Sequence, residues 1–208
     1  MGNMAKLYFY YAAMNAGKST TLLQADFNYR ERGMGTMLWT AAHDDRAGGG
    51  VIGSRIALSA PAHIYSDQVD LFDAVAEEIK RRPLHCVLVD EAQFLTRDHV
   101  LQLCRISDDL GIPVLCYGLR TDFQGVLFEG SAALLALADA LIELKAVCDC
   151  GRKASMNLRV DAEGRAVAAG AQTEIGGNDR YVGLCRRHFF ARLREGEAHQ
   201  MSLALPRT

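Results

Sequence analysis

The sequence contains no apolar run that approaches the roughly 18 residues needed to cross a membrane. Its first residues, Met1–Lys6, lack the long apolar stretch of a secretory signal peptide. There is no excess of basic charge, because 23 lysines and arginines face 25 aspartates and glutamates, for a formal net charge of −2. A surface that binds nucleic acid is usually clearly basic. We therefore expect a cytoplasmic protein that binds neither membranes nor nucleic acid.

The composition is that of an ordinary globular protein, with 50% hydrophobic and 23% charged residues. A length of 208 residues predicts one domain, with at most a small additional part. The six cysteines form two groups. Cys86, Cys104 and Cys116 stand singly among apolar residues, as is typical of small buried thiols. The other three cluster with a histidine near the C-terminal end and need another explanation.

From Leu7 to about Val147, strand-like and helix-like segments alternate, which predicts right-handed βαβ units and a largely parallel sheet flanked by helices. The expected strands are Leu7–Tyr11, Met37–Thr40, Cys86–Val89, Val114–Tyr117 and Leu141–Leu144. The expected helices are Ser19–Glu31, Val69–Arg81, Arg97–Leu110 and Gly130–Ala138.

The most informative segment follows the first strand. A strand, a tight loop that ends in Gly-Lys-Ser and a helix form a P-loop, whose backbone N–H groups surround phosphates at the helix N-terminus. Lys18 would reach the terminal phosphates and the Ser19 hydroxyl would bind Mg²⁺, whereas the alternative is a plain turn of small residues. Ala12 replaces the usual first glycine, so the backbone must have ordinary angles there. The predicted phosphate-binding residues are Ala12, Ala13, Met14, Asn15, Ala16, Gly17, Lys18 and Ser19.

An acidic pair, Asp90-Glu91, directly follows the apolar strand Cys86–Val89. Ligands bind at the carboxyl ends of the strands in such sheets, so we expect Asp90 to hold Mg²⁺ opposite Ser19. Glu91 would activate water in an ATPase, or accept the proton of an acceptor hydroxyl in a small-molecule kinase. The alternative is an acidic N-cap for the helix that follows.

Two close pairs of potential metal ligands, Cys148 with Cys150 and Cys185 with His188, are separated by 34 residues. Three thiolates and one imidazole complete a tetrahedral zinc site that leaves no position for water, so its role would be structural. The alternative is a set of scattered buried thiols and a surface histidine.

Five motifs in order resemble those of the cellular-type (type II) thymidine kinases, and look closest to the enterobacterial enzymes. The resemblance covers roughly Lys6 to Phe190. It implies ATP-dependent transfer of the γ-phosphoryl group to the 5′-hydroxyl of thymidine, an alcohol acceptor, giving dTMP in nucleotide salvage for DNA synthesis. Deoxyuridine would be a second substrate, thymidine triphosphate (dTTP) a feedback inhibitor, and the assembly a homotetramer. The motifs are Met14–Ser19, Asp90–Phe94, Leu119–Phe123, the two ligand pairs and Gly176–Tyr181.

The resemblance also implies roles for single residues, with Glu91 as the general base. Cys-x-Cys replaces the family's Cys-x₂-Cys, and His188 replaces the cysteine of many relatives. The residues around ATP and Mg²⁺ would be, besides the P-loop, Asp44, Asp45, Arg46, Asp90 and Gln93. The residues around thymidine would be Phe94, Leu119, Phe123, Phe128 and Tyr181, with the lid stretch Thr173, Glu174, Ile175, Gly176 and Gly177 binding the base largely through its main chain. The zinc ligands would be Cys148, Cys150, Cys185 and His188.

The predicted fold class is α/β: a P-loop (RecA-like), largely parallel sheet flanked by helices, with a small zinc-stapled lid. We divide the chain into a P-loop nucleotide-binding kinase domain (1–147), a zinc-containing lasso or lid domain (148–192) and a C-terminal tail (193–208). Within the lid we expect a hairpin formed by Met156–Val160 and Ala166–Ala169, with its turn at Asp161–Gly164.

Two other classes of protein compete with the kinase. A P-loop ATPase in which Glu91 activates water explains the first two motifs, but not the ligand pairs or Gly176–Tyr181. A zinc-ribbon module that binds nucleic acid would use the basic residues near the metal, but the acidic balance and the P-loop argue against it. These basic residues are Arg152, Lys153, Arg186 and Arg187.

Overall fold

The computed structural model describes residues 5–42, 49–172 and 181–204, with side chains as far as residue 196. The chain divides into two compact units. Unit 1 comprises residues 1–11, 17–120 and 128–144, and unit 2 comprises residues 12–16, 121–127 and 145–208. Each unit has its own buried apolar side chains. No helix among the described residues is long and apolar enough to span a membrane.

Unit 1 is built on a six-stranded sheet with the strand order β5-β2-β6-β7-β1-β8. β2 pairs in parallel with β5 and β6, β6 with β7, and β1 with β8. The four residues of β6 are all buried, as expected for a strand covered on both faces. The strands are β1 (Leu7–Ala12), β2 (Thr36–Ala41), β5 (His63–Tyr65), β6 (Cys86–Val89), β7 (Val114–Leu119) and β8 (Ala140–Glu143).

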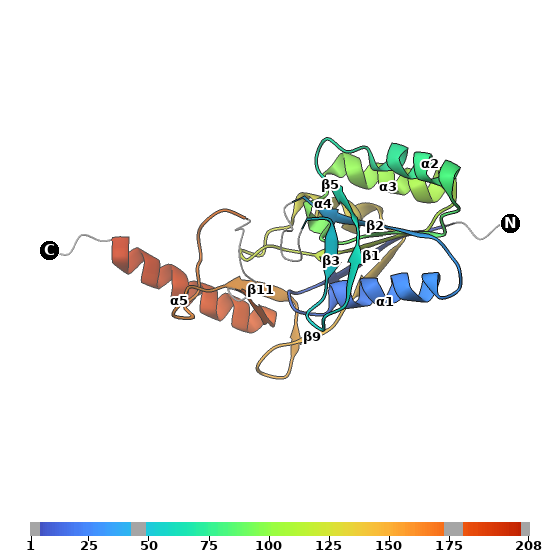
Figure 1. Ribbon diagram of the computed structural model, residues 1–208. Coiled ribbons are helices and arrows are strands. Elements are labelled where there is room, and N and C mark those ends of the chain that lie inside the picture. Colours follow the sequence, from blue (N-terminus) through green and yellow to red (C-terminus); the bar gives the residue numbers. More distant parts are fainter. Residues whose placement is uncertain (1–4, 43–48, 173–180, 205–208) are drawn as a thin grey trace. The chain divides into compact units, whose positions relative to one another are not determined.

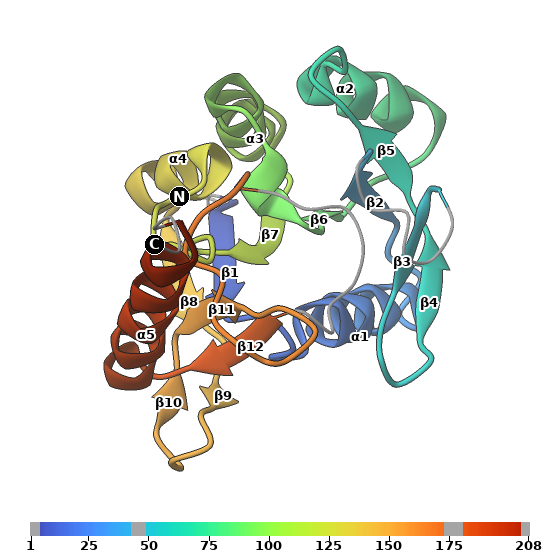
Figure 2. The same ribbon diagram turned by 90° about the vertical axis from the view of Figure 1, so that its left-hand side faces the viewer.

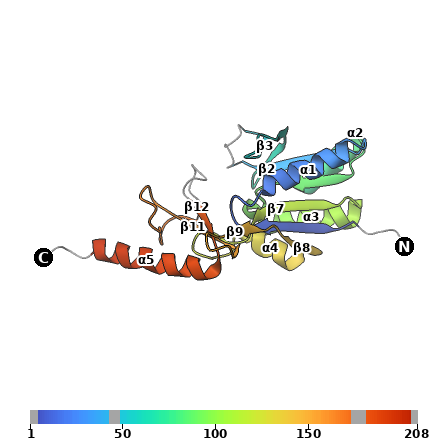
Figure 3. The same cartoon turned by 90° about the horizontal axis from the view of Figure 1, so that it is seen from below.

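Helices cover both faces of this sheet, which confirms the predicted α/β class (Figure 1). On one face α2, α3 and α4 share a core with β1, β2, β6 and β7, and α3 lies along β7 (Figure 3). On the other face lie α1 and the antiparallel hairpin β3–β4 (Figure 2). The bounds are α1 (Lys18–Arg30), β3 (Val51–Gly53), β4 (Ser59–Pro61), α2 (Leu71–Arg81), the 3₁₀ helix η1 (Ala92–Phe94), α3 (Arg97–Leu110) and α4 (Glu129–Leu137).

Local signals explain where the helices begin and end. α3 begins with a capping box, in which the Thr96 side chain accepts from the His99 N–H and the His99 ring accepts from the Thr96 N–H. It ends at Gly111, whose φ of 67° is the usual helix-ending conformation.

The five expected strands and four expected helices are present in the structure, with small shifts at their ends. The sequence reasoning missed β5 and the β3–β4 hairpin, because three-residue strands carry almost no periodicity.

Unit 2 consists of two short antiparallel ladders and a helix. β9 (Ala146–Val147) pairs with β10 (Lys153–Ala154), β11 (Met156–Arg159) pairs with β12 (Tyr181–Leu184), and α5 (Arg186–Ala204) follows. Leu158 and Phe189 are fully buried in the core between the β11–β12 ladder and α5.

The predicted hairpin in unit 2 forms, but it is short. At its turn the Gly164 N–H donates to the Asp161 carbonyl (3.0 Å), and beyond the turn Ala166 bridges Val160 and the Val167 N–H donates to the Arg159 carbonyl (2.9 Å). The longer ladder of β11, which the sequence analysis did not predict, is with β12. A turn signal marks a partner nearby in the sequence, whereas no local signal marks a partner strand farther along the chain. α5 also continues to Ala204, so the boundary proposed at residue 193 falls inside a helix.

Candidate functional site

The P-loop starts at Ala12, the last residue of β1, and leads into α1 at Lys18. Asn15 (φ 63°) and Gly17 (φ 80°) adopt left-handed backbone conformations, and Gly17 is the N-cap of α1. Ala12 is not among the residues with positive φ, as expected for a residue with a Cβ atom. A helix leaves its first N–H groups without partners inside the helix, so this end of α1 suits an anion.

The P-loop serine is bonded to the acidic pair. The Ser19 hydroxyl donates to the Asp90 carboxylate at 2.9 Å, and the other Asp90 oxygen accepts from the Glu91 N–H at 3.0 Å. Asp90 is only 1% exposed. Burial, with the Glu91 charge as the second cause, raises the pKa of Asp90 to about 7 against the opposing effect of the Ser19 hydrogen bond. A cation in this position would favour the ionised carboxylate.

The groups around Asp90 fit a magnesium ion. Ser19 and Asp90 both offer oxygen atoms, which are the ligands that Mg²⁺ prefers. Trp39 lies opposite Val89 in the β2–β6 ladder, so Thr40 stands next to Asp90 in the sheet. The Thr40 hydroxyl is fully buried and has no hydrogen-bond partner in the described part of the chain. A buried hydroxyl without a partner lowers the stability of the fold. A hydrogen bond to a water molecule on the ion, or to a phosphate oxygen, would satisfy the Thr40 hydroxyl.

Glu91 is held in an unusual geometry. Its φ of 50° and ψ of 36° lie in the left-handed region, which residues other than glycine rarely adopt. The Glu91 carboxylate accepts from the Gln93 side-chain amide (2.5 Å), whose oxygen accepts from the Leu119 N–H (3.0 Å). A Cβ atom at Gly118 would lie 2.9 Å from the Gln93 backbone nitrogen, so glycine allows β7 to approach this closely. Gln93 thus joins Glu91 to the end of β7.

Three of the predicted substrate residues lie in unit 1: Phe94, Leu119 and Phe128. The rings of Phe94 and Phe128 meet edge to face, with centroids 5.9 Å apart and an interplanar angle of 78°. The Leu119 carbonyl accepts from the Ser131 hydroxyl at the start of α4. These contacts hold η1, β7 and α4 together beside Glu91.

Phe123 and Tyr181 lie in unit 2. Phe123 is 1% exposed, and the Arg159 guanidinium lies 3.9 Å from its ring centroid, so this ring is a buried anchor of unit 2. Tyr181 is half-buried in β12 and lines a cavity of about 430 Å³ that Met14 and Asn15 of the P-loop also line. Unit 2 therefore brings the predicted substrate residue Tyr181 next to part of the predicted phosphate loop.

The remaining predicted site residues lie outside the described residues. They are Asp44, Asp45 and Arg46 on the ATP side, and Thr173, Glu174, Ile175, Gly176 and Gly177 on the thymidine side.

The sequence analysis did not identify two buried polar residues that hold the P-loop and the Glu91 backbone in place. Asn157 is 2% exposed and accepts a hydrogen bond from the Met14 N–H, and Tyr65 is 2% exposed and donates to the Glu91 carbonyl. The sequence carried one signal for Asn157, because it is an amide between Met156 and Leu158 in a strand whose residues are all buried. No comparable signal marked Tyr65, which fits an apolar core position equally well.

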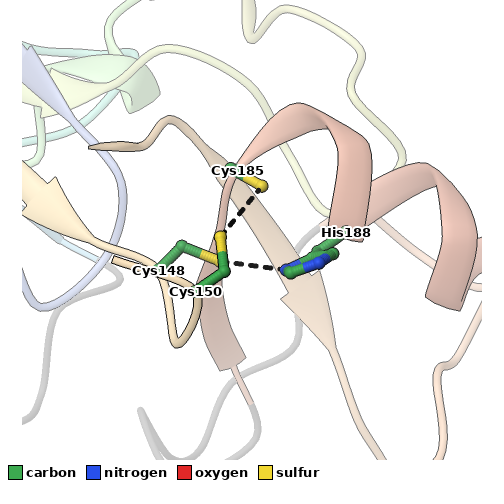
Figure 4. Close-up of side chains that lie close together, drawn as sticks. All are labelled: Cys148, Cys150, Cys185 and His188. Atoms are coloured by element: carbon green, nitrogen blue, oxygen red, sulfur yellow. Dashed lines mark hydrogen bonds between the residues drawn. The ribbon is translucent and has the colours of Figure 1, made fainter. Parts of the chain in front are cut away.

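The structure brings the four predicted metal ligands together. Their ligand atoms all lie within 4.8 Å of one another, and the side chains converge (Figure 4). Cys148 Sγ is 3.4 Å from His188 Nδ1, and Cys150 Sγ is 3.8 Å from Cys185 Sγ. With Zn–S bonds of about 2.3 Å, two sulfur ligands of a tetrahedral zinc ion lie roughly 3.8 Å apart. The cluster therefore has the size and the ligand set of a structural zinc site.

Two elements of unit 2 supply these ligands. Cys148 and Cys150 lie in the turn between β9 and β10, Cys185 directly precedes α5, and His188 is in its first turn. The backbone N–H groups of Cys150 and Cys185 lower the pKa of the Cys148 thiol to about 6. The thiolate is the form that binds metal, so the local backbone already favours the ligand state.

A parallel sheet with a P-loop at the start of α1, an acidic pair bonded to that loop and a Cys₃His cluster together define a P-loop nucleotide-binding α/β protein. The family model described as thymidine kinase matches residues 5–189, and the chain belongs to this family. The resemblance inferred from the motifs is thus confirmed.

Relatives named thymidine kinase align over nearly their full length. The Novosphingobium aromaticivorans protein is 73% identical over 186 residues, which are 89% of this chain and 97% of that protein. The Zymomonas mobilis protein is 63% identical over 190 residues, 91% of this chain and 98% of that protein. The Salmonella typhimurium protein is 58% identical over 193 residues, 93% of this chain and 94% of that protein.

Proposed function

We propose that this protein transfers the γ-phosphoryl group of ATP to the 5′-hydroxyl of thymidine, with deoxyuridine as a second acceptor. The observation that carries phosphoryl transfer is the 2.9 Å hydrogen bond between Ser19 and Asp90, which joins the P-loop helix to the acidic pair at the carboxyl edge of the sheet. Family membership and the names of the relatives support thymidine as the acceptor. A homotetramer inhibited by dTTP is the expectation that accompanies the family resemblance.

In this proposal the start of α1 binds the phosphates. Backbone N–H groups of residues 12–19, apart from that of Met14, which donates to Asn157, and the Lys18 ammonium group hold the phosphate oxygens in line for transfer. Ser19 and Asp90 hold Mg²⁺, which when bound neutralises charge on the transferring phosphoryl group. The ATP side is completed by Asp44, Asp45, Arg46 and Gln93. The Gln93 side chain also orients the Glu91 carboxylate through its hydrogen bond.

Glu91 is the proposed general base. Its carboxylate receives the proton of the 5′-hydroxyl as the oxygen attacks the γ-phosphorus, and the bond from that phosphorus to the leaving oxygen of ADP breaks. Phosphoryl transfer asks the protein mainly for positioning, which the Gln93 bridge to Leu119 provides for Glu91. The proposed thymidine-binding residues are Phe94, Leu119, Phe123, Phe128, Tyr181 and the stretch 173–177.

We also propose that Cys148, Cys150, Cys185 and His188 hold a structural zinc ion. The donor set fits zinc, and four protein ligands leave no open position for catalysis. The ion would fasten the β9–β10 turn to the start of α5 and so order the lid, whose closure would exclude water from the phosphoryl group.

The decisive experiment is a nucleoside screen. The protein is incubated with ATP, Mg²⁺ and one nucleoside at a time: thymidine, deoxyuridine, deoxycytidine, deoxyadenosine or deoxyguanosine. The 5′-monophosphate products are separated by chromatography, then identified and quantified by mass spectrometry. We expect dTMP, a smaller yield of deoxyuridylate and no purine product, with Lys18→Ala as the inactive control. Release of phosphate from ATP at the same rate with and without nucleosides would instead identify an ATPase.

A further inference from the structure

Tyr65 links an edge strand of the unit 1 sheet to the acidic pair. It is the last residue of β5, and its ring is 2% exposed and meets the His99 ring with centroids 6.0 Å apart. Its hydroxyl lies 2.8 Å from the Glu91 carbonyl oxygen and 3.4 Å from that of Asp90. Because both neighbours are carbonyl oxygens, the phenol donates, and the closer acceptor is Glu91.

The Tyr65 side chain reaches across β2, and its backbone is fixed in the β2–β5 ladder. β2 lies between β5 and β6, so the Tyr65 side chain spans the end of β2 to reach the peptide that follows β6. Tyr65 pairs with Ala41 in the β2–β5 ladder, and the Ala42 N–H donates to its carbonyl at 2.9 Å. Packing does not require a hydroxyl here, because a phenylalanine would bury the same ring in the same core. The role of the hydroxyl is therefore its hydrogen bond to the Glu91 carbonyl.

The Glu91 peptide requires support. Its left-handed conformation is unfavourable for a residue with a Cβ atom and persists only where the surrounding contacts impose it. Its carbonyl accepts from the Tyr65 hydroxyl and from the Phe94 N–H (3.0 Å), and its N–H donates to Asp90. Of these three contacts, only the one from Tyr65 comes from outside the segment 90–94. It ties the Glu91 carbonyl to β5, while the Gln93 side chain ties the segment to the end of β7.

We propose that Tyr65 is a positioning residue for phosphoryl transfer: its hydroxyl holds the Glu91 peptide in the left-handed conformation and so aims the Glu91 carboxylate at the acceptor hydroxyl. This inference rests on the proposed function, in which Glu91 is the general base. Gln93 holds the carboxylate end of the residue, and Tyr65 holds its backbone end. A base must lie within hydrogen-bond reach of its proton, so a displacement of about 1 Å is enough to slow the reaction.

The test is Tyr65→Phe, which removes only the hydroxyl. We expect kcat with thymidine to fall about tenfold, the order of effect of one lost hydrogen bond. The KM values for ATP and thymidine should stay within about twofold, since the binding groups are untouched. The matched control is Tyr29→Phe, which removes a hydroxyl from a half-buried ring near the C-terminal end of α1, packed on the opposite face of the sheet. This control should keep normal kcat.

A double-mutant cycle separates positioning from a general loss of folding. If Tyr65 acts through Glu91, Tyr65→Phe should cost less than about twofold when it is added to Glu91→Gln, because the base is already absent. All rates are divided by the fraction of molecules that bind a fluorescent ADP analogue, which corrects for any unfolded protein. A purely structural effect would lower that fraction, or would reduce the corrected kcat by the same factor in the wild-type and Glu91→Gln backgrounds.

The outcomes distinguish the two claims. Wild-type protein that phosphorylates no nucleoside would reject the proposed function itself. Active wild-type protein with normal kcat for Tyr65→Phe, or with an equal further loss in the Glu91→Gln background, would overturn the role of Tyr65 and leave the proposed function in place.

Discussion

The side-chain oxygen of Asn157 lies 2.7 Å from the backbone nitrogen of Met14, so a strand of unit 2 holds the middle of the P-loop. The side-chain nitrogen of Asn157 donates to the Thr121 carbonyl at 3.2 Å. Asn157 lies on β11, whose partner β12 leads directly to the metal ligand Cys185. One amide thus connects the P-loop, the loop after β7 and the ladder next to the Cys/His cluster, all within unit 2.

Asn157→Leu should weaken ATP binding. The change keeps the volume but leaves the Met14 N–H and the Thr121 carbonyl without this partner, at a cost of about 1–3 kcal/mol for each group that is left unpaired. We expect the KM for ATP to rise about tenfold and the melting temperature to fall. Asn157→Asp keeps the acceptor for Met14 and should raise the KM for ATP less. Asn28→Leu on the exposed surface of α1 is the control, and an unchanged KM for ATP in Asn157→Leu would refute the role of this amide.

The Cys/His cluster should hold about one zinc ion per chain, measured by elemental analysis of protein purified without added metal. Cys185→Ser should lower the zinc content and loosen unit 2, because structural zinc in small peptides contributes on the order of 10 kcal/mol to folding. Hydrogen exchange should therefore rise in residues 145–172, whereas the sheet of unit 1 keeps its protection. Cys104→Ser, a thiol outside the cluster, is the control. Zinc-free wild-type protein would contradict this assignment.

Tyr181→Ala should raise the KM for thymidine more than the KM for ATP. Tyr181 is half-buried and lines the same cavity as Met14, so its loss opens this side of unit 2 without removing a phosphate ligand. We expect roughly a tenfold rise in the thymidine KM, the usual scale for one lost aromatic contact. Steady-state kinetics with each substrate varied in turn measures both values, and Tyr181→Phe should remain close to wild type. An unaltered thymidine KM in Tyr181→Ala would place the substrate nearer Phe123.

Glu91→Gln should lower kcat by about 10²- to 10⁴-fold, the usual contribution of general-base catalysis. ATP affinity should change little, because Lys18, Ser19 and the loop backbone remain. Asp90→Asn should behave differently and shift the Mg²⁺ concentration that gives half-maximal activity. Both variants are assayed with thymidine across a Mg²⁺ titration.

Near-normal kcat in Glu91→Gln would make Glu91 a structural cap, and another carboxylate would have to be the base. Asp122 is poorly suited to that role. Its carboxylate accepts from the N–H groups of Gln124 and Val126 and from the Gln172 side chain, so it organises the loop after β7.

The sequence by itself determined the parts of this protein whose signals are local. The P-loop, the acidic pair after β6 and the two ligand pairs are each contained within eight residues or fewer, and alternating strand and helix patterns are enough to predict a parallel sheet. Parallel strands bring their carboxyl ends to one edge, so the meeting of Ser19 and Asp90 followed from the order of the elements.

Only the tertiary structure decided which distant groups meet. Asn157 and Met14 are 143 residues apart, and Tyr65 reaches Glu91 from a strand too short to predict. β11 forms its longer ladder with β12, a pairing that no local pattern in the sequence marks. The physical reason is that periodicity records only which face of an element is buried. Hydrogen-bond partners across a core depend on how whole elements pack, and these contacts hold the P-loop and Glu91 in place.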